Sequence, residues 1–269
     1  MKFGLIGHPI AHSLSPALFK AGFDGRYPYE LIETSKFEDA YQRFLDGYDG
    51  INVTAPFKEL AYCKADIISE ECRLIGATNL LIKTSEGVAA YNSDYRGLCA
   101  WIQGIQTESQ SRKALIIGLG GAGKAAAAAA WNCGLELTLM NRDITKAADM
   151  SSRLGGVSGG KDISVRPLSD FPECFHNADI IIYNLPVSIV SPDDLLEATQ
   201  PPKGTQRKHL LEANYKNPSF TTEHLNRLQE GGLDIEYHPG QTWLLMQAVT
   251  GYEIFTGEKP DLSRMSEQI

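Results

Sequence analysis

KALIIGLGGAGKAAAAAAWNCGLELTLMNR, residues 113–142, decides the fold. The apolar run Ala114–Ile117 predicts a buried strand, and the alanine-rich Lys124–Cys133 predicts a helix. Between them stands Gly118-Leu119-Gly120-Gly121-Ala122-Gly123, a complete G-x-G-x-x-G. Its first glycine permits a tight turn, the second lets backbone N–H groups approach a pyrophosphate, and the third lets helix and strand pack closely. Strand, glycine turn and helix in this order predict a dinucleotide-binding unit; a tight loop without a ligand is the alternative.

The strand expected at Leu135–Met140 runs into Asn141 and Arg142. Dinucleotide-binding units that take NAD carry an Asp or Glu at this place, which bonds the ribose 2′-hydroxyl. An arginine can instead pair with a 2′-phosphate and stack on adenine, so Arg142 favours NADP over NAD. Asp143 opposes this preference, because its carboxylate would repel the phosphate unless it points away. In the alternative interpretation, Arg142 merely begins a solvated helix.

Length and composition predict two domains. The chain has 269 residues, more than one ordinary domain of about 100–200 residues. Hydrophobic residues make up 43% and charged residues 22%, which excludes a disordered or fibrous chain. The 25 Lys and Arg against 33 Asp and Glu give a net charge of −8, so we expect no nucleic-acid partner.

The cysteines and the apolar segments indicate a cytoplasmic protein. Five scattered cysteines without a CxxC spacing predict neither a metal site nor a disulfide framework. The N-terminal MKFGLIGHPI lacks the continuous apolar core of a signal peptide. No apolar stretch reaches the roughly 18 residues that span a bilayer, so we expect no membrane partner.

The N-terminal half has an α/β pattern. Apolar runs at Phe3–Ile6, Tyr29–Ile32 and Gly50–Val53, separated by helix-like segments, predict a parallel sheet. A helix is expected to start at Ser15-Pro16, with Ser15 as its cap. A strand at Leu80–Lys83, a helix at Tyr95–Ile105 and a polar linker at Gln106–Lys113 are expected to follow.

Polar residues stand where these strands meet the helices that follow them. Ser13 and Ser15 lie beside a helix N-terminus, which favours an anion such as a carboxylate, although ordinary capping explains Ser15 equally well. Lys58 follows a strand and a proline turn; a solvated surface lysine is the alternative. Asn79 ends the segment Gly76-Ala77-Thr78-Asn79, and Asp94 ends Tyr91-Asn92-Ser93-Asp94 just before a helix, so Asp94 taken alone would be a helix cap. Together these side chains are expected to converge on one edge of the sheet.

Six motifs occur in an order that resembles the shikimate dehydrogenase family. They are HSLSP (12–16), NVTAPFKE (52–59), GATNLL (76–81), YNSDYRG (91–97), GLGGAGKA (118–125) and NRDITKA (141–147). The resemblance spans nearly the full length and implies reduction of 3-dehydroshikimate to shikimate with NADPH, a step of chorismate and aromatic amino acid biosynthesis. It implies that Ser13 and Ser15 hold the substrate carboxylate, that Thr54, Asn79 and Asp94 hold the ring hydroxyls, and that Lys58 and Asp94 form the catalytic pair.

The C-terminal part is similar to two further motifs of the family. Tyr215 lies in a segment similar to D-x-x-Y-x-P, and residues 240–248 resemble G-x-x-M-L-x-x-Q-A, which implies Gln247 and Tyr215 at the substrate and Gly240 near the nicotinamide. The chain departs from the family pattern at several positions, with Glu212 in place of Asp, one extra residue before Pro218, Tyr183-Asn184-Leu185 in place of Asn-Ala-Thr, and Ile189 and Trp243 in place of methionines. These departures concern the packing of the nicotinamide.

The implied fold has an α/β substrate domain (1–104), a Rossmann-like NADP domain (105–239) and C-terminal helices (240–269) that return to the first domain. Helical spacing of Leu244, Ala248 and Tyr252 supports the return. The expected partner is the small-molecule substrate, in a monomer or homodimer. Two alternatives stay open, namely an NAD-using quinate/shikimate dehydrogenase, which Asp143 favours, and a non-catalytic ligand sensor on the same fold, which the intact Lys58 and Asp94 oppose.

Overall fold

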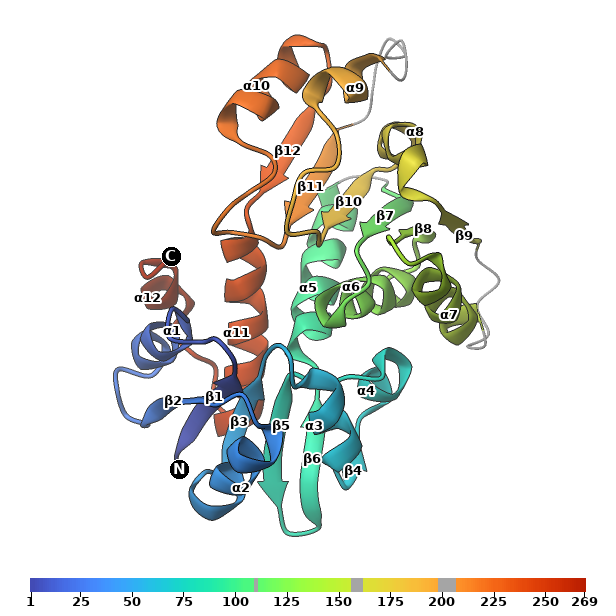
Figure 1. Cartoon of the computed structure of the whole chain (residues 1–269). Helices are drawn as coiled ribbons and strands as arrows, with labels where there is room; N and C mark the ends of the chain where they lie inside the picture. Colours follow the sequence, from blue (N-terminus) through green and yellow to red (C-terminus); the bar gives the residue numbers. More distant parts are fainter. Residues whose placement is uncertain (109–110, 156–161, 198–206) are drawn as a thin grey trace. The chain divides into compact units, whose positions relative to one another are not determined.

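The computed structural model describes residues 1–108, 111–155, 162–197 and 207–269. The chain forms two compact units (Figure 1). The N-terminal unit comprises Met1–Leu98 and Leu244–Ile269, and the central unit comprises Cys99–Trp243. The two divisions between the units fall within helices α5 (Ser93–Glu108) and α11 (Gly240–Thr256), a few residues from the boundaries at 104/105 and 239/240 that the sequence predicted.

The sheet of the N-terminal unit is mixed, which corrects the expected parallel sheet. Its strand order is β2 (Tyr29–Glu33), β1 (Phe3–Gly7), β3 (Gly50–Val53), β5 (Leu80–Thr84), β6 (Gly87–Tyr91) and β4 (Ile67–Ile68). Strand β1 is parallel to β2 and β3, but β5 is antiparallel to both β3 and β6. The reason is the short connection from Thr84 to Gly87, which closes a hairpin, whereas a parallel pair needs a longer crossover.

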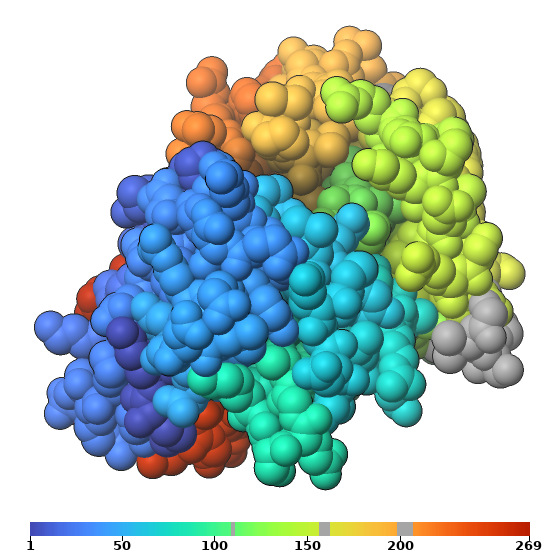
Figure 2. Space-filling view, turned by 60° about the horizontal axis from the view of Figure 1, so that its bottom comes forward, coloured from blue at the N-terminus to red at the C-terminus, as the bar shows by residue number. Residues whose placement is uncertain are grey.

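The N-terminal unit contains both ends of the chain. Its helices are α1 (Ser15–Gly22), α2 (Phe37–Gly47), α3 (Lys58–Lys64), α4 (Glu70–Ile75), the start of α5, most of α11 (Gly240–Thr256), and α12 (Leu262–Ser266). The aromatic ring of Phe255 stacks on Phe3 at 4.8 Å between centroids, and Tyr252 meets Phe19 edge-on at 4.7 Å. The red C-terminal residues accordingly lie beside the blue N-terminal ones on the surface (Figure 2). The predicted C-terminal return is confirmed.

The central unit is built on a fully parallel sheet. Its strand order is β12 (Ile235–His238), β11 (Lys208–Glu212), β10 (Ile180–Tyr183), β7 (Lys113–Ile117), β8 (Glu136–Met140) and β9 (Ile163–Arg166). Numbered along the chain, this is the 3-2-1-4-5-6 order of dinucleotide-binding folds. The glycine turn follows β7, the central strand where the order reverses, which is where such sheets bind ligands.

The connecting segments of the central unit are helical. They are α6 (Gly121–Asn132), α7 (Ile144–Gly155), a 3₁₀ turn (Leu168–Asp170), α8 (Phe171–Asn177), α9 (Pro192–Glu197) and α10 (Thr222–Glu230). The six consecutive alanines of α6 are all fully buried, because small side chains let this helix lie close to the sheet. None of the helices among the described residues is long and apolar enough to cross a bilayer.

Candidate active site

Lys58 and Asp94 form an ion pair at the start of two helices. Lys58 is the first residue of α3, which follows β3, and Asp94 is the second residue of α5, which follows β6. The Nζ atom of Lys58 donates to Oδ2 of Asp94 at 2.6 Å. The two side chains are 18% and 12% exposed, so the pair is reached by solvent only at its edge. This burial excludes the alternative in which Lys58 is an ordinary solvated surface lysine.

Asn79 and Gln247 meet at Ser93, the residue before Asp94. The Oδ1 atom of Asn79 accepts from the backbone N–H of Ser93 at 2.7 Å, and its Nδ2 donates to Ser93 Oγ at 3.0 Å. That hydroxyl also donates to Gln247 Oε1 at 3.1 Å, which links helices α5 and α11. The network fixes the N-terminus of α5 and hence the position of Asp94. Ser93 was missed by the sequence analysis, although its place between Asn92 and Asp94 in YNSDYRG was the available signal.

Two predicted helix caps are corrected. Asn92, not Asp94, caps α5, because its Oδ1 accepts from the backbone N–H of Tyr95 at 3.1 Å. Ser15 is the first residue of α1 rather than its cap, and its own N–H donates to Ser13 Oγ at 3.2 Å. The Ser13 hydroxyl in turn donates to Ser15 Oγ at 3.1 Å. Both hydroxyls therefore lie together at the beginning of α1.

The residues of the N-terminal unit share one edge of its sheet. Strands β1 and β3 are adjacent and parallel, so the segments after them, with Ser13 and Thr54, leave the sheet at the same edge. Lys58 follows Thr54 by four residues and begins helix α3. The structure thus places Ser13, Ser15, Thr54, Lys58, Asn79, Asp94 and Gln247 in one unit.

The glycine turn of the central unit requires its glycines for three different reasons. Gly118 has a φ of +83°, a left-handed conformation that side chains disfavour. A Cβ on Gly123 would overlap the carbonyl oxygen of Gly118, so only glycine lets α6 pack there. A Cβ on Gly120 would meet nothing within 4 Å, which leaves the backbone open to a ligand. Since α6 begins at Gly121, the first N–H groups of this helix, including those of Gly121 and Ala122, have no helical partners and fit a pyrophosphate.

Asn141 and Asp143 organise the segment between β8 and α7. Asn141 Oδ1 accepts from the backbone N–H of Leu119 at 3.0 Å, which ties this segment to the glycine turn. The Asp143 carboxylate accepts from the hydroxyl of Thr145 at 2.6 Å and from its backbone N–H at 3.1 Å, and these bonds lower the pKa of Asp143. Asp143 is therefore committed to the start of α7, while Arg142 is exposed. The residues present fit a 2′-phosphate at Arg142.

Two of the residues that depart from the family pattern, Glu212 and Trp243, are buried. Glu212 is fully buried and accepts from the N–H groups of Ser219 (2.5 Å) and Phe220 (3.1 Å) and from the hydroxyl of Tyr237 (3.0 Å). It thereby holds the loop that carries Tyr215, a half-buried tyrosine whose pKa is raised by desolvation. Trp243 is buried and its indole N–H has no hydrogen-bond partner among the described residues.

Two more positions near these departures are tightly packed. The hydroxyl of Tyr183 donates to the carbonyl of Val187 at 2.6 Å, and burial raises the pKa of Tyr183 to about 12. A Cβ on Gly240 would press against the carbonyl oxygens of Glu212 and Ala213, so glycine is required at the start of α11. Tyr215 and Gly240, like the glycine turn and Arg142, belong to the central unit.

Comparison with known proteins decides the family. Residues 5–81 match the family model "Shikimate dehydrogenase substrate binding domain", and residues 102–212 match "Shikimate / quinate 5-dehydrogenase". The shikimate dehydrogenase (NADP(+)) of Rubrobacter xylanophilus is 33% identical over 97% of this chain and 93% of its own length. That of Carboxydothermus hydrogenoformans is 29% identical over 99% of this chain and 95% of its own length.

The chain belongs to the shikimate dehydrogenase family. The resemblance seen in the six motifs is confirmed, and so is the two-domain α/β fold. Among solved structures, shikimate 5-dehydrogenase from Thermus thermophilus in complex with NADP(H) and shikimate superposes with a TM-score of 0.79 at 25% identity, covering 100% of this chain and 98% of that one. Quinate dehydrogenase from Corynebacterium glutamicum in complex with NAD has a TM-score of 0.84 at 23% identity over the same shares, which is a likeness of fold.

Proposed function

We propose that this protein reduces 3-dehydroshikimate to shikimate with NADPH, as a step in the synthesis of chorismate and the aromatic amino acids. The observation that carries the proposal is the 2.6 Å pair of Lys58 and Asp94, nearly enclosed in the unit that matches the family's substrate-binding domain. A buried ammonium next to a carboxylate is a group that can give a proton to a developing alkoxide. The non-catalytic sensor would not need such a pair.

The cofactor site is assigned to residues 105–239 together with Gly240, which also belongs to the central unit. NADPH, when bound, supplies the hydride. The backbone of Gly118, Gly120, Gly121, Ala122 and Gly123 receives the pyrophosphate at the N-terminus of α6, whose helix dipole favours an anion. Asn141 holds the turn in shape, and Arg142 pairs with the 2′-phosphate. Gly240 lies at the start of α11, where a side chain has no room, and is assigned to the nicotinamide end.

The substrate site is assigned to residues 1–104 together with 240–269. The adjacent hydroxyls of Ser13 and Ser15 bind the carboxylate of the substrate. Thr54, Asn79 and Asp94 bind its ring hydroxyls, and Gln247 is a further contact. Tyr215, which belongs to the central unit, is also proposed to contact the substrate. Asn79 and Gln247 already bond Ser93, so their remaining hydrogen-bonding groups are held in fixed directions.

Lys58 is proposed as the proton donor. Addition of a hydride to a ketone leaves negative charge on oxygen, and an ammonium both stabilises that charge and can protonate it. An ionised carboxylate does neither, so Asp94 is proposed to orient Lys58 and a substrate hydroxyl.

The protein is proposed to work in the cytoplasm as a monomer or homodimer, with small molecules as its partners. None of the five cysteines, all of which lie in the described part of the chain, forms a disulfide, which suits a reducing compartment.

The test is an absorbance assay of nicotinamide reduction with shikimate or quinate against NADP or NAD. We expect turnover with shikimate and NADP to exceed every other combination. If turnover is fastest with quinate and NAD, the proposal is wrong and the protein is a quinate dehydrogenase. Binding of shikimate without turnover in any combination would replace it by the ligand sensor.

A further inference from the structure

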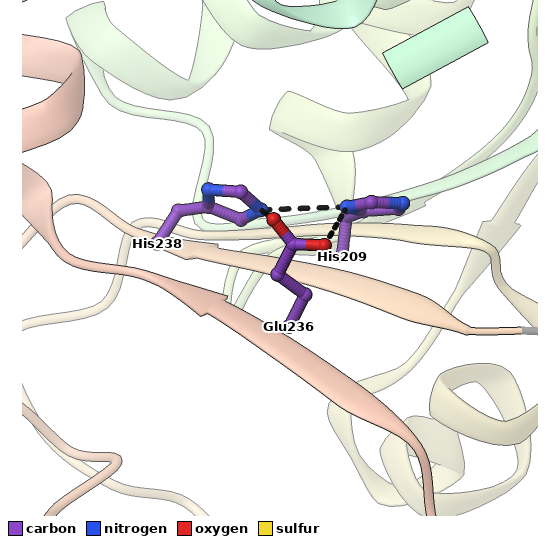
Figure 3. A group of neighbouring side chains, drawn as sticks. All are labelled: His209, Glu236 and His238. Atoms are coloured by element: carbon purple, nitrogen blue, oxygen red, sulfur yellow. Dashed lines mark hydrogen bonds and ion pairs between the residues drawn. The ribbon is translucent and has the colours of Figure 1, made fainter. Parts of the chain in front are cut away.

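Two histidines and a glutamate converge on one face of the central sheet (Figure 3). His209 lies on β11, and Glu236 and His238 lie on the edge strand β12. His209 is the direct pairing partner of Glu236 in the parallel ladder. Glu236 and His238 are two residues apart on the same strand, so their side chains point to the same face.

The ligand-type atoms of the three residues lie within 4.8 Å of one another, and each imidazole is nearest to a different carboxylate oxygen of Glu236. His209 Nδ1 lies 3.4 Å from His238 Nε2 and 3.7 Å from Glu236 Oε2, and His238 Nε2 lies 3.6 Å from Glu236 Oε1. A tetrahedral zinc ion with bonds of about 2.0–2.1 Å holds its ligand atoms about 3.3–3.4 Å apart. The two imidazole nitrogens already have that spacing, and a rotation of the Glu236 carboxylate would bring one of its oxygens toward both of them.

The surroundings favour a bound cation. The His209 side chain is 6% exposed and that of His238 is 16% exposed, whereas Glu236 is 44% exposed and leaves one side open to water. The indole of Trp101 packs edge-on against the His238 ring at 5.1 Å, which restrains the ring.

Arg207 is the one arginine or lysine among the described residues that pairs with Glu236. Its Nη1 lies 3.5 Å from Glu236 Oε2, but its Nε lies 3.3 Å from Asp234 Oδ1. The Arg207 side chain is 57% exposed and can stay with Asp234 while Glu236 turns to a metal. We therefore expect Arg207 to lower the affinity of the three residues for a cation but not to prevent the cation from binding.

We propose that His209, Glu236 and His238 bind a zinc ion, with a water molecule as the fourth ligand. Two imidazoles and one carboxylate are a donor set that zinc accepts. The ion would fasten the edge strand β12 to β11 immediately before Pro239 and Gly240, where the chain leaves the sheet. It takes no part in the proposed reduction, so the proposal stands or falls independently of the activity.

The experiment measures zinc binding by the whole chain after removal of metals with EDTA. Zn²⁺ is titrated in competition with a chromophoric chelator, and Co²⁺ is titrated in parallel for its visible spectrum. We expect one Zn²⁺ per chain and a four-coordinate Co²⁺ spectrum. The absence of a thiolate charge-transfer band in that spectrum would distinguish this site from metal binding by any of the five cysteines. Glu236→Gln should weaken zinc binding by at least about 10- to 100-fold, the loss that changes around metal ligands already cause.

The control is Glu223→Gln, an exposed glutamate of α10 in the same unit, which should bind zinc like the native chain. His238→Gln is a second variant, and circular dichroism checks that each variant is folded. In ¹⁵N-NMR, zinc should shift the Nδ1 of His209 and the Nε2 of His238. The proposal is overturned if the native chain takes up no zinc in competition, or if folded Glu236→Gln and His238→Gln keep native affinity.

Discussion

The ammonium of Lys58 lies 2.6 Å from the carboxylate of Asp94, and both groups are largely shielded from water. We expect Lys58→Ala to lower kcat about 10²- to 10⁴-fold, the usual contribution of a general acid, with little change in KM. The measurement is steady-state kinetics under conditions in which the chemical step limits turnover. Lys64→Ala, at the exposed end of the same helix, is the control and should keep the native rate. A Lys58→Ala enzyme within a few-fold of native kcat would contradict the assignment.

Arg142 is the residue on which the choice of cofactor is expected to depend. A bidentate, charge-assisted pair with a 2′-phosphate is worth about 1.5–3 kcal/mol, or roughly a ten- to hundredfold preference for NADP over NAD. Arg142→Ala should remove most of that preference, measured as the ratio of kcat/KM for the two cofactors. Lys146→Ala removes a nearby exposed cation of α7 and should leave the ratio unchanged. If the ratio of kcat/KM for NADP and NAD is the same in the native protein and in Arg142→Ala, Arg142 does not determine the choice of cofactor.

Asp143 need not oppose this preference as its charge alone suggests. Its carboxylate bonds both the hydroxyl and the N–H of Thr145, which lowers its pKa and keeps it ionised at the start of α7. The sequence showed the charge but not this bond. Whether the Asp143 carboxylate repels a 2′-phosphate depends on the direction in which it points. In the structure it points toward Thr145, in the first turn of α7.

At the scale of the element, two glycines of the turn between β7 and α6 have different roles: Gly120 is expected to matter for cofactor binding and Gly123 for folding. Gly120→Val adds a side chain into open space, so the protein should fold normally and lose affinity for NADP. Gly123→Ala places a methyl group against the carbonyl of Gly118, so it should destabilise the central unit itself. Cofactor titration and thermal unfolding, measured on both variants, distinguish the two effects. Native affinity for NADP in Gly120→Val would mean that the backbone at this turn does not approach the pyrophosphate.

The elements differ in how well their sequences predict them. Strand–glycine–helix segments such as β7, the turn and α6 follow from neighbouring residues, because the turn, the apolar run and the helix formers are contiguous. Helix starts at α1 and α5 were predicted one or two residues off, since Ser13 and Asn92 provide the hydrogen bonds that Ser15 and Asp94 were expected to provide. Strands β4 and β6 were missed; β4 has only two residues, and β6 exists through its hairpin with β5.

At the scale of the whole molecule, the last helices complete the first unit. Phe255 is 5% exposed and stacks on Phe3, so Phe255→Ala should lower the free energy of unfolding of the N-terminal unit by about 3–5 kcal/mol. All three tryptophans lie in the central unit, so their fluorescence reports that unit, while circular dichroism reports both. We expect an earlier denaturant transition by circular dichroism and an unchanged affinity for NADP.

The control for this variant is Leu262→Ala, which truncates a side chain that is 53% exposed and should cost less than about 0.5 kcal/mol. If Phe255→Ala unfolds at the same denaturant concentration as the native protein, the aromatic cluster does not carry the stability assigned to it.

The sequence by itself determined the glycine turn, most of the strands, the return of the C-terminal helices and the family, because each depends on residues that are close together or on motifs in a fixed order. Tertiary structure alone decided which distant side chains meet. Lys58 and Asp94 are 36 positions apart, and their contact requires β3 and β6 to flank an antiparallel β5. His209 meets Glu236 and His238 only through the register of β11 against β12. Strand pairing is a long-range choice made by burial and by hydrogen bonding of the whole sheet, so no local pattern contains it.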